Sequence, residues 1–229
     1  MNNFCLLMYC NEKYKLFQEK TSKELIESGI INKSFIKDEN DLKQTIFYKE
    51  HKKILSVPRG AGYCLWKPYY ILETLSLLQD NEILFYLDSG DCIINILEFK
   101  EKIDKLIFDK DYLFFDGGFL QKEYTRYDCF YMMNCLNSNY TDRIQLEAGV
   151  LFLKNTPFIK NFVKEWLHYC SNYQIISDEQ NIYGNNFSEF KDHRHDQSIL
   201  TNLVEKYKLS SIPMENSVRQ DNIKCNYYK

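Results

Sequence analysis

The strongest constraint on the fold of this chain is the alternation of strand-length apolar runs with segments of helical periodicity. Apolar runs occupy residues 4–9, 82–87, 111–115 and 145–153, and a short strand is expected near 210–212. Helical spacing or helix-type composition marks residues 12–28, 39–53, 98–108, 157–170 and 196–207. The alternation predicts an α/β fold, with a mostly parallel central sheet and helices on both faces.

Local signals add detail to the helices. Gly29 suits the C-terminal cap of the helix expected over residues 12–28. Pro68 suits the first turn of a helix that continues through the apolar residues after it. Residues 125–128 (TRYD) match a capping box that would open a helix reaching residue 136.

Composition limits the class of protein. The 229 residues suffice for one large domain, and a hydrophobic content of 45% supplies its core. A net charge of −3 gives no basic bias toward nucleic acid. The eight cysteines form no CxxC pair, which predicts reduced thiols in a cytoplasmic protein. No apolar run approaches the ~18 residues of a membrane span, and the N-terminal run lacks the basic flank of a signal peptide.

The stretch FYLDSGD places two carboxylates directly after a predicted buried strand. Asp88 ends the apolar run, and Asp91 follows after Ser89 and Gly90. In α/β sheets, ligands bind beyond the carboxyl ends of the strands. Carboxylates at that edge hold a divalent cation, act as acid and base, or make local turn hydrogen bonds.

The glycine-rich stretch RGAGYCLWKP precedes this strand. Its glycines let the backbone approach a ligand closely, its two cations suit phosphate groups, and its flat rings suit a base. The competing interpretation is an ordinary turn with the tryptophan in the core. A nucleotide site in this stretch would use Arg59, Gly60, Gly62, Tyr63, Trp66 and Lys67.

The order and spacing of these motifs resemble nucleotide-sugar glycosyltransferases of the GT-A fold, a group found in bacterial polysaccharide clusters and large DNA viruses. The pattern R-G-x-G-Y-x-x-W-K-P is followed by a helix and by a strand ending in Y-L-D-S-G. Downstream, HRHDQS at 193–198 is similar to the Asp-Gln motif of the retaining galactosyltransferase and glycogenin-like branch. The resemblance implies one GT-A-like, Rossmann-like domain over 1–229, with a nucleotide-binding part of about 1–118 and an acceptor-binding part of about 119–229.

The resemblance also implies a site for a metal and a donor. Asp88 would hold Mn²⁺ or Mg²⁺, with His195 or His193 as a further ligand. Gly90 stands where the family pattern has its second Asp, which leaves open whether Asp91 coordinates directly, through water or not at all. The implied donor-binding residues are Arg59, Gly60, Gly62, Tyr63, Trp66, Lys67, Asp88, Ser89, Arg126 and Asp128.

Catalytic groups are implied by two downstream motifs: HRHDQS, and EAGV at 147–150, which is similar to the acidic-Gly segment that lines the acceptor side in these enzymes. Glu147 or Asp196 would act as the base on the acceptor hydroxyl, and Asp196 with Gln197 would hold the donor sugar. The structural alternative is that Glu147 is an ordinary strand residue and that Asp196 merely begins a helix. The DGG sequence at residues 116–118 is expected to form a mobile loop over the site.

The predicted function is transfer of a sugar from a nucleotide-diphosphate donor to a glycan or lipid-linked acceptor, in polysaccharide biosynthesis. No nucleic acid partner and no transmembrane segment are expected, and membrane contact would be peripheral. Two alternatives stay open. A nucleotidyltransferase would usually carry a glycine-rich signature directly after its first strand, where this chain has NEKYKLFQ. A non-catalytic carbohydrate-binding module would use the aromatic residues, but such modules are usually all-β.

Overall fold

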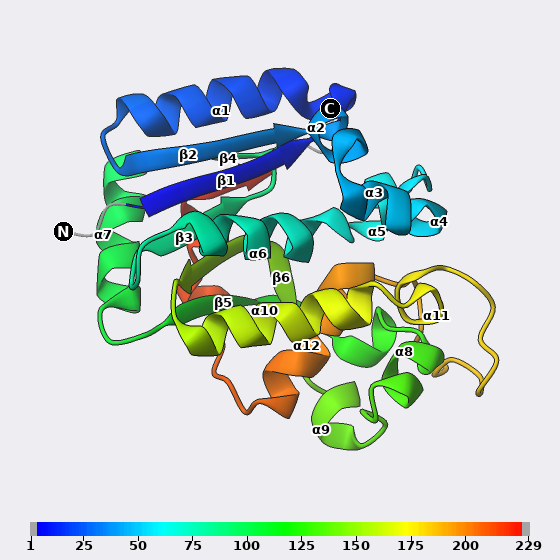
Figure 1. Ribbon diagram of the computed structural model, residues 1–229. Coiled ribbons are helices and arrows are strands. Elements are labelled where there is room, and N and C mark those ends of the chain that lie inside the picture. The colour runs from blue at the N-terminus through cyan, green and yellow to red at the C-terminus, as the bar shows by residue number, and fades with distance from the viewer. Residues whose placement is uncertain (1–3, 226–229) are drawn as a thin grey trace.

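A five-stranded sheet organises the protein, as seen in a computed structural model that describes residues 4–225 (Figure 1). The strand order is β2-β1-β3-β6-β5. β1 pairs in parallel with β2 and β3, whereas β6 runs antiparallel to β3 and β5. Four of these five strands therefore run in the same direction and β6 runs against them, so the sheet is mostly parallel, as predicted. Its strands are β1 (Phe4–Cys10), β2 (Ile31–Asp38), β3 (Ile83–Leu87), β5 (Tyr112–Leu120) and β6 (Ile144–Lys154).

Each face of the sheet packs into its own hydrophobic core. Side chains alternate across a strand, so Phe4 and Leu6 of β1 enter one core while Cys5 and Leu7 enter the other. The first core is covered by α1 (Lys15–Glu27) and α7 (Ile96–Ile107). The second is covered by α6 (Trp66–Leu77), α10 (Pro157–Cys170) and α12 (His195–Lys206). The prediction of helices on both faces is confirmed.

Shorter elements surround this framework. The segment predicted as one helix over residues 39–53 is broken into three. The first break is at Thr45, which is extended and caps the second piece by accepting a hydrogen bond from Tyr48 N, and the second break is at His51, which is not helical. The three pieces are α2 (Glu39–Gln44), α3 (Ile46–Glu50) and α4 (Lys52–Leu55). The other short helices are α5 (Gly60–Tyr63), α8 (Tyr127–Met132), α9 (Ser138–Thr141), α11 (Tyr173–Ile176) and α13 (Val218–Asp221), with 3-10 turns at Glu12–Tyr14, Gln121–Glu123 and Met214–Asn216.

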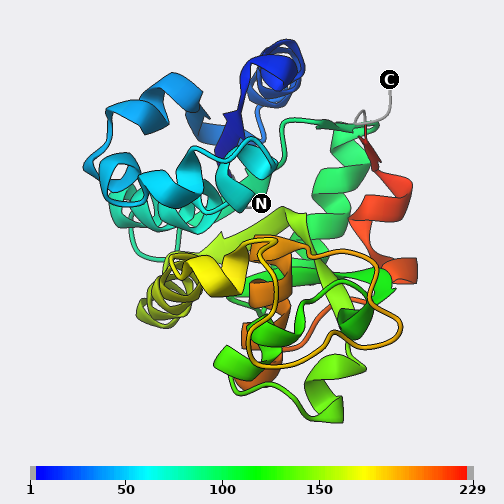
Figure 2. The same cartoon turned by 90° about the vertical axis from the view of Figure 1, so that its right-hand side faces the viewer.

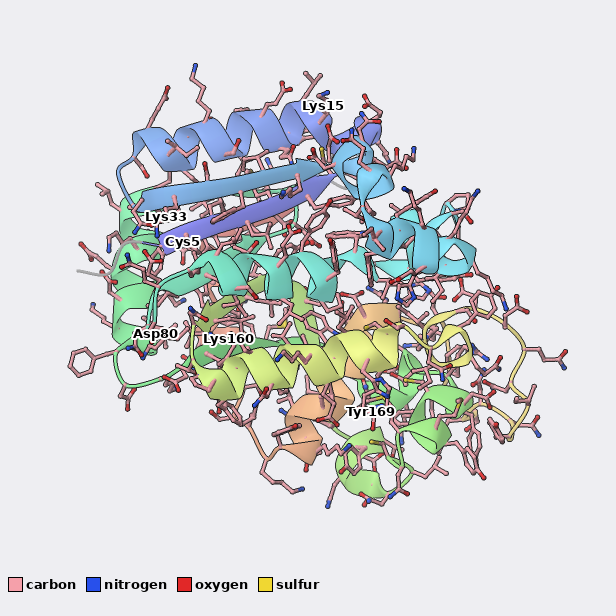
Figure 3. The ribbon with its side chains drawn as sticks, viewed as in Figure 1. Cys5, Lys15, Lys33, Asp80, Lys160 and Tyr169 are labelled. Atoms are coloured by element: carbon pink, nitrogen blue, oxygen red, sulfur yellow. The ribbon has the colours of Figure 1, made fainter. Side chains whose placement is uncertain are left out.

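The edge strand β2 was not predicted. Most of its residues are polar and half are exposed, so the sequence lacks the apolar run by which the other strands are recognised. Its position is set by pairing instead: Lys33 lies beside Cys5 of β1 (Figure 3) and forms a 2.8 Å ion pair with Glu82, just before β3. A second, two-stranded sheet of β4 (Asp91–Ile93) and β7 (Ile223–Cys225) was also missed.

Three local predictions were wrong. The DGG sequence at 116–118 lies inside β5 and is not a loop over the site. The TRYD sequence does not form a capping box, since Arg126 caps α8 without a side-chain hydrogen bond and the helix ends at Met132. Near residues 210–212 only an isolated bridge between Phe115 and Ile212 forms.

The helix over residues 12–28 exists, but its buried face is largely polar. Leu16 is 79% exposed, whereas Gln18 and Thr21 are buried. Both make hydrogen bonds to the framework, because Gln18 Nε2 donates to Lys37 O and Thr21 Oγ1 donates to Asp91 O. No helix among residues 4–225 is long and apolar enough to cross a membrane.

Candidate functional site

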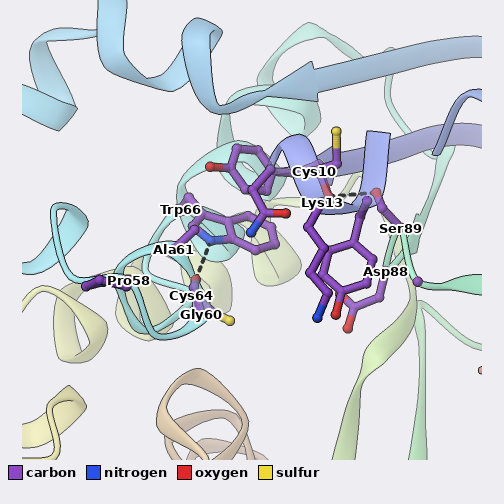
Figure 4. A pocket seen from close by; sticks show the side chains of 13 residues that line it. Cys10, Lys13, Pro58, Gly60, Ala61, Cys64, Trp66, Asp88 and Ser89 are labelled. Atoms are coloured by element: carbon purple, nitrogen blue, oxygen red, sulfur yellow. Dashed lines mark hydrogen bonds between the residues drawn. The ribbon is translucent and has the colours of Figure 1, made fainter. Parts of the chain in front are cut away.

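A cavity of about 400 Å³ opens beyond the carboxyl ends of β1 and β3 (Figure 4). This is the edge at which the sequence predicted a ligand site. The end of β1 and the residues after it form one wall, the glycine-rich loop forms a second, and the DSG turn after β3 forms a third. The lining residues are Tyr9, Cys10, Asn11, Lys13, Tyr14, Pro58, Gly60, Ala61, Cys64, Trp66, Asp88, Ser89 and Gly90.

Two stacked rings support the glycine-rich wall. The ring centroids of Trp66 and Tyr9 lie 3.9 Å apart with an interplanar angle of 26°. Trp66 Nε1 donates a hydrogen bond to Gly60 O at 2.9 Å, which ties the ring to the loop (Figure 4). Trp66 is therefore both a packing residue and a lining residue. Tyr63 lies away from the cavity, buried against the His195 ring.

The glycine-rich loop has an uncommon backbone. Five consecutive residues, 60–64, have positive φ angles between 48° and 96°. Three of them (Ala61, Tyr63 and Cys64) are not glycine, and each pays about 1–2 kcal/mol for this conformation. Gly62 is required by space as well, since a Cβ there would lie 2.5 Å from Leu55 Cα. Such strain is concentrated at functional sites when the surrounding structure enforces it.

Asp88 is held in one orientation at the tip of β3. Its Oδ1 accepts a hydrogen bond from the Tyr86 hydroxyl and lies 3.5 Å from Lys67 Nζ. Its Oδ2 lies over Gly149 of β6, where a Cβ would be only 3.1 Å away. Gly149 thus makes room for this carboxylate, which is the role of the glycine that the sequence places inside the strand.

Lys67 was predicted to bind the ligand, but it does not line the cavity. Its side chain is 4% exposed, and its ammonium lies 3.0 Å from Asp196 Oδ2 and donates to Ala148 O at 3.0 Å. Burial lowers the pKa of Lys67, but Asp196 and Asp88 outweigh burial and raise it above its usual range, so the lysine is charged. This ion pair network joins β3, β6 and the start of α12.

Ser89 and Asp91, which follow Asp88 in the chain, have structural contacts. Ser89 Oγ donates to Tyr9 O at 2.7 Å and thereby ties the turn to the end of β1. Asp91 is fully buried at the start of β4, with its Oδ2 also close to Gly149. Of the two carboxylates, only Asp88 lines the cavity.

Arg59 points away from this cavity. Its guanidinium forms ion pairs with Asp178, at 3.1 Å, and Asp192. Lys67 is buried and Arg59 faces elsewhere, so among residues 4–225 the cationic side chain that lines the cavity is Lys13. Lys13 and Asn11 were not among the predicted site residues, although they lie three residues and one residue after the first strand, where a ligand-binding edge was expected.

The two histidines do not join Asp88 and Asp91. His195 Nε2 contacts Asp178 Oδ1 at 3.0 Å, and both ring nitrogens of His193 contact backbone groups of Ile175 and Arg126. Burial, with Arg59 nearby, lowers the pKa of His195 to about 3, so its ring is neutral. Within residues 4–225, no group of three or more His, Cys, Asp or Glu side chains could hold a metal ion.

Arg126 lines a second cavity, and the buried Asp128 contacts the segment that forms much of that cavity. Arg126 Nη1 donates to Ser177 O at 2.6 Å, and the Asp128 carboxylate accepts from the backbone of Ile182 and Tyr183. Both side chains are buried and hold the segment that follows α11. They do not line the cavity beside Asp88.

The catalytic candidates lie on β6 and α12, two elements that pack against each other. Glu147 is half-buried on β6, two residues before Gly149. Asp196 is buried against Lys67, and Gln197 Nε2 donates to Gln145 Oε1 at 3.0 Å. Lys67 thus links Asp196 to Asp88, although separate roles were predicted for these two carboxylates from the sequence.

No family model and no curated protein matches this chain. Among solved structures, the apo WbbM bifunctional glycosyltransferase is similar with a TM-score of 0.50 and 10% identity, over 93% of this chain and 39% of that one. The apo form of mouse xyloside xylosyltransferase 1 gives 0.49 and 12%, over 92% and 85%. Galactosyltransferase LgtC with donor and acceptor sugar analogues gives 0.41 and 14%, over 87% and 70%. At such identities the similarity concerns the fold alone, and it supports the prediction of a GT-A-like α/β fold.

Proposed function

We propose that this protein is a glycosyltransferase that binds a nucleotide-diphosphate sugar in the cavity beyond β1 and β3. The observation that carries the proposal is the meeting of Asp88, Lys13 and the Trp66 wall at the carboxyl ends of two parallel strands. The GT-A-like fold is compatible with this assignment. The acceptor would be a glycan or a lipid-linked glycan, and a lipid-linked acceptor would bring the protein into peripheral contact with a membrane.

The donor would lie between the strand ends and the glycine-rich loop. Asn11 Oδ1 is buried and has no hydrogen-bond partner among the described residues, so it would accept from the base or ribose. Lys13 would contact the diphosphate as a point charge, in the role that the sequence analysis gave to Arg59 and Lys67. The backbone of Gly60 would allow close approach of the ligand.

A divalent cation fits this site in part. Mg²⁺ is commonly held by one or two carboxylates together with substrate phosphates, and Asp88 offers one such carboxylate at the cavity. We propose Asp88 as the protein ligand, with Asp91 buried behind it and His195 directed to Asp178. When bound, the cation would neutralise charge on the departing nucleotide diphosphate.

Catalysis would use the residues of β6 and α12 that lie beyond Asp88. Glu147 is the half-buried carboxylate we propose as the base on the acceptor hydroxyl. Asp196 is buried and paired with Lys67, so it would act by fixing the orientation of Asp88 and of the start of α12. Gln197, next to Gln145, would bind the donor sugar, a role it would share with the retaining enzymes that the motif resembles.

Thermal unfolding with UDP, GDP, CDP and dTDP, each with and without Mn²⁺, tests the donor site. Ligand at about 100 times its dissociation constant adds about 2.7 kcal/mol, which is a shift of about 5–10 °C for a domain of this size. Asp88→Asn and Lys13→Met should each remove most of the shift, and Lys105→Met, an exposed lysine on α7, should leave it intact. No shift with any nucleotide would refute the donor site.

Transfer itself is tested with the nucleotide that binds. Glu147→Gln should leave the thermal shift unchanged and abolish transfer of sugar from the matching nucleotide sugar to glycan acceptors. Wild-type transfer by this variant would remove Glu147 from catalysis.

A further inference from the structure

A second cavity, of about 380 Å³, lies beside the donor cavity. The two cavities flank one loop, since Arg59 lines the second and Gly60 lines the first. Most of the second cavity is formed by residues 177–194, which contain no helix or strand and appear in Figure 2 as the amber loop in front of α8. Irregular segments of this length are uncommon in compact domains and are usually functional.

The segment is fixed in place by side chains of α8. The Asp128 carboxylate accepts hydrogen bonds from Ile182 N at 2.8 Å and Tyr183 N at 3.1 Å. Tyr127 N donates to Asn186 Oδ1 at 2.8 Å. Gly184 packs so closely on Tyr127 that a Cβ there would lie 2.4 Å from the ring. The cavity is therefore preorganised and does not need a ligand to form it.

The charges around the cavity are balanced. Arg59 pairs with Asp178 and Asp192, which leaves little field to attract an anion. His193 is buried, and burial lowers its pKa well below the usual range, so it adds no charge. Three cations and three acids line the cavity: Arg59, Arg126, Lys191, Asp178, Glu179 and Asp192. This balance favours a neutral ligand over a phosphate or a carboxylate.

One buried donor in the lining has no acceptor. Arg126 is 3% exposed, and its Nη1 donates to Gln174 O and Ser177 O. Its Nη2 is buried without a hydrogen-bond partner in the described part of the chain, and the Asp128 carboxylate is 3.9 Å away, too far for a hydrogen bond. A buried donor of this kind is expected to be satisfied, and a ligand hydroxyl in the cavity would do so.

The rest of the lining suits a sugar ring. Side-chain amides and acids supply both donors and acceptors for hydroxyl groups, and Phe190 supplies an apolar face for ring C–H groups. We propose that this cavity binds a neutral pyranose unit of the acceptor glycan. The identification of this pyranose as part of an acceptor rests on the proposed transferase function. The binding of a pyranose in the cavity does not depend on that function.

The test is a titration of ¹⁵N-labelled full-length protein with neutral methyl pyranosides of the gluco, galacto, manno and xylo series. Glucuronate and inorganic phosphate serve as charged probes. We expect at least one neutral pyranoside to shift the backbone and side-chain amide signals of residues 177–194, with a dissociation constant on the order of millimolar. Asn185→Ala, at an exposed lining position, should weaken this binding about fivefold, the effect of losing one hydrogen bond.

Two further variants separate binding from folding. Asn139→Ala, at an exposed position on α9, should bind as the wild type does. Arg126→Lys removes Nη2 and should abolish binding, provided that its amide spectrum stays folded elsewhere. The inference is refuted if no neutral pyranoside shifts these signals up to about 50 mM, far above a millimolar dissociation constant, or if only glucuronate or phosphate does.

The nucleotide titration distinguishes this failure from that of the donor site. Nucleotide binding without pyranoside binding would refute the second cavity alone. Pyranoside binding at residues 177–194 without any nucleotide binding would support the cavity and would refute the transferase function.

Discussion

Replacing Lys67 with methionine should destabilise the fold by about 3–5 kcal/mol, the cost of removing one partner from a buried ion pair. Methionine keeps most of the side-chain volume, so the loss comes from the charge. The side chains of Lys67 and Asp196 are 4% and 5% exposed, so water screens the pair little. Without the ammonium, the Asp196 carboxylate would stay buried without a cation, and Ala148 O would lose its donor.

A double-mutant cycle isolates the interaction. Asp196→Asn alone should cost less than Lys67→Met, because Asp88 remains as a partner for the lysine. The double variant should be more stable than the sum of the two changes predicts, by about 1–3 kcal/mol for residues in direct contact. Lys23→Met serves as the control, since its ion pair with Glu27 is solvent-exposed and should give no measurable change.

Equilibrium urea unfolding, followed by tryptophan fluorescence, measures the free energy of unfolding of the wild type and of each variant. Both tryptophans report on the site, because Trp66 adjoins Lys67 in the chain and Trp166 Nε1 donates to Asp196 O at 3.0 Å. A loss below about 1 kcal/mol for Lys67→Met would fall outside the cost of breaking a buried pair. That result, or additive effects in the cycle, would refute the assignment of Lys67 as the ion that joins Asp88 and Asp196.

Three further predictions concern backbone fit and pH. Gly62→Ala should cost more than about 1 kcal/mol in urea unfolding, because φ is 96° and the new Cβ would lie 2.5 Å from Leu55 Cα; an unchanged midpoint would contradict this. Gly149→Ala should displace Asp88 Oδ2 and weaken nucleotide binding in calorimetry, and wild-type affinity would count against that contact. The pKa of His195, about 3 when folded and 6.5 when unfolded, lies lower in the native state, so stability is complete above pH 6.5 and falls below it. The loss should reach about 2 kcal/mol by pH 5. His195→Asn, which tolerates the positive φ, should remove this contribution and leave that of His193, whose pKa burial also lowers; an unchanged slope of urea-derived stability between pH 7 and 5 would assign the effect elsewhere.

The strands buried on both faces could be predicted because each is a continuous apolar run, as in β1 and β3. The long helices α10 and α12 were equally clear from their periodicity and start signals. The edge strand β2 could not be found in this way, since its stability comes from pairing with β1 and not from burial. The break at Thr45 was missed because it changes only a few dihedral angles and leaves the apolar pattern of the sequence intact on both sides.

The sequence alone also predicted where the candidate site lies: Asp88 was expected at the carboxyl edge of the sheet, with the glycine-rich loop beside it, and both line the cavity there. Only the tertiary structure decided which side chains face the cavity. Lys67 and Arg59 carry the charges that suit phosphate, yet acids distant in the chain, Asp196 and Asp178, draw them away. Lys13 takes their place at the cavity. The reason is physical: residue type fixes what a group can bind, whereas the partners that compete for it are brought together only by folding.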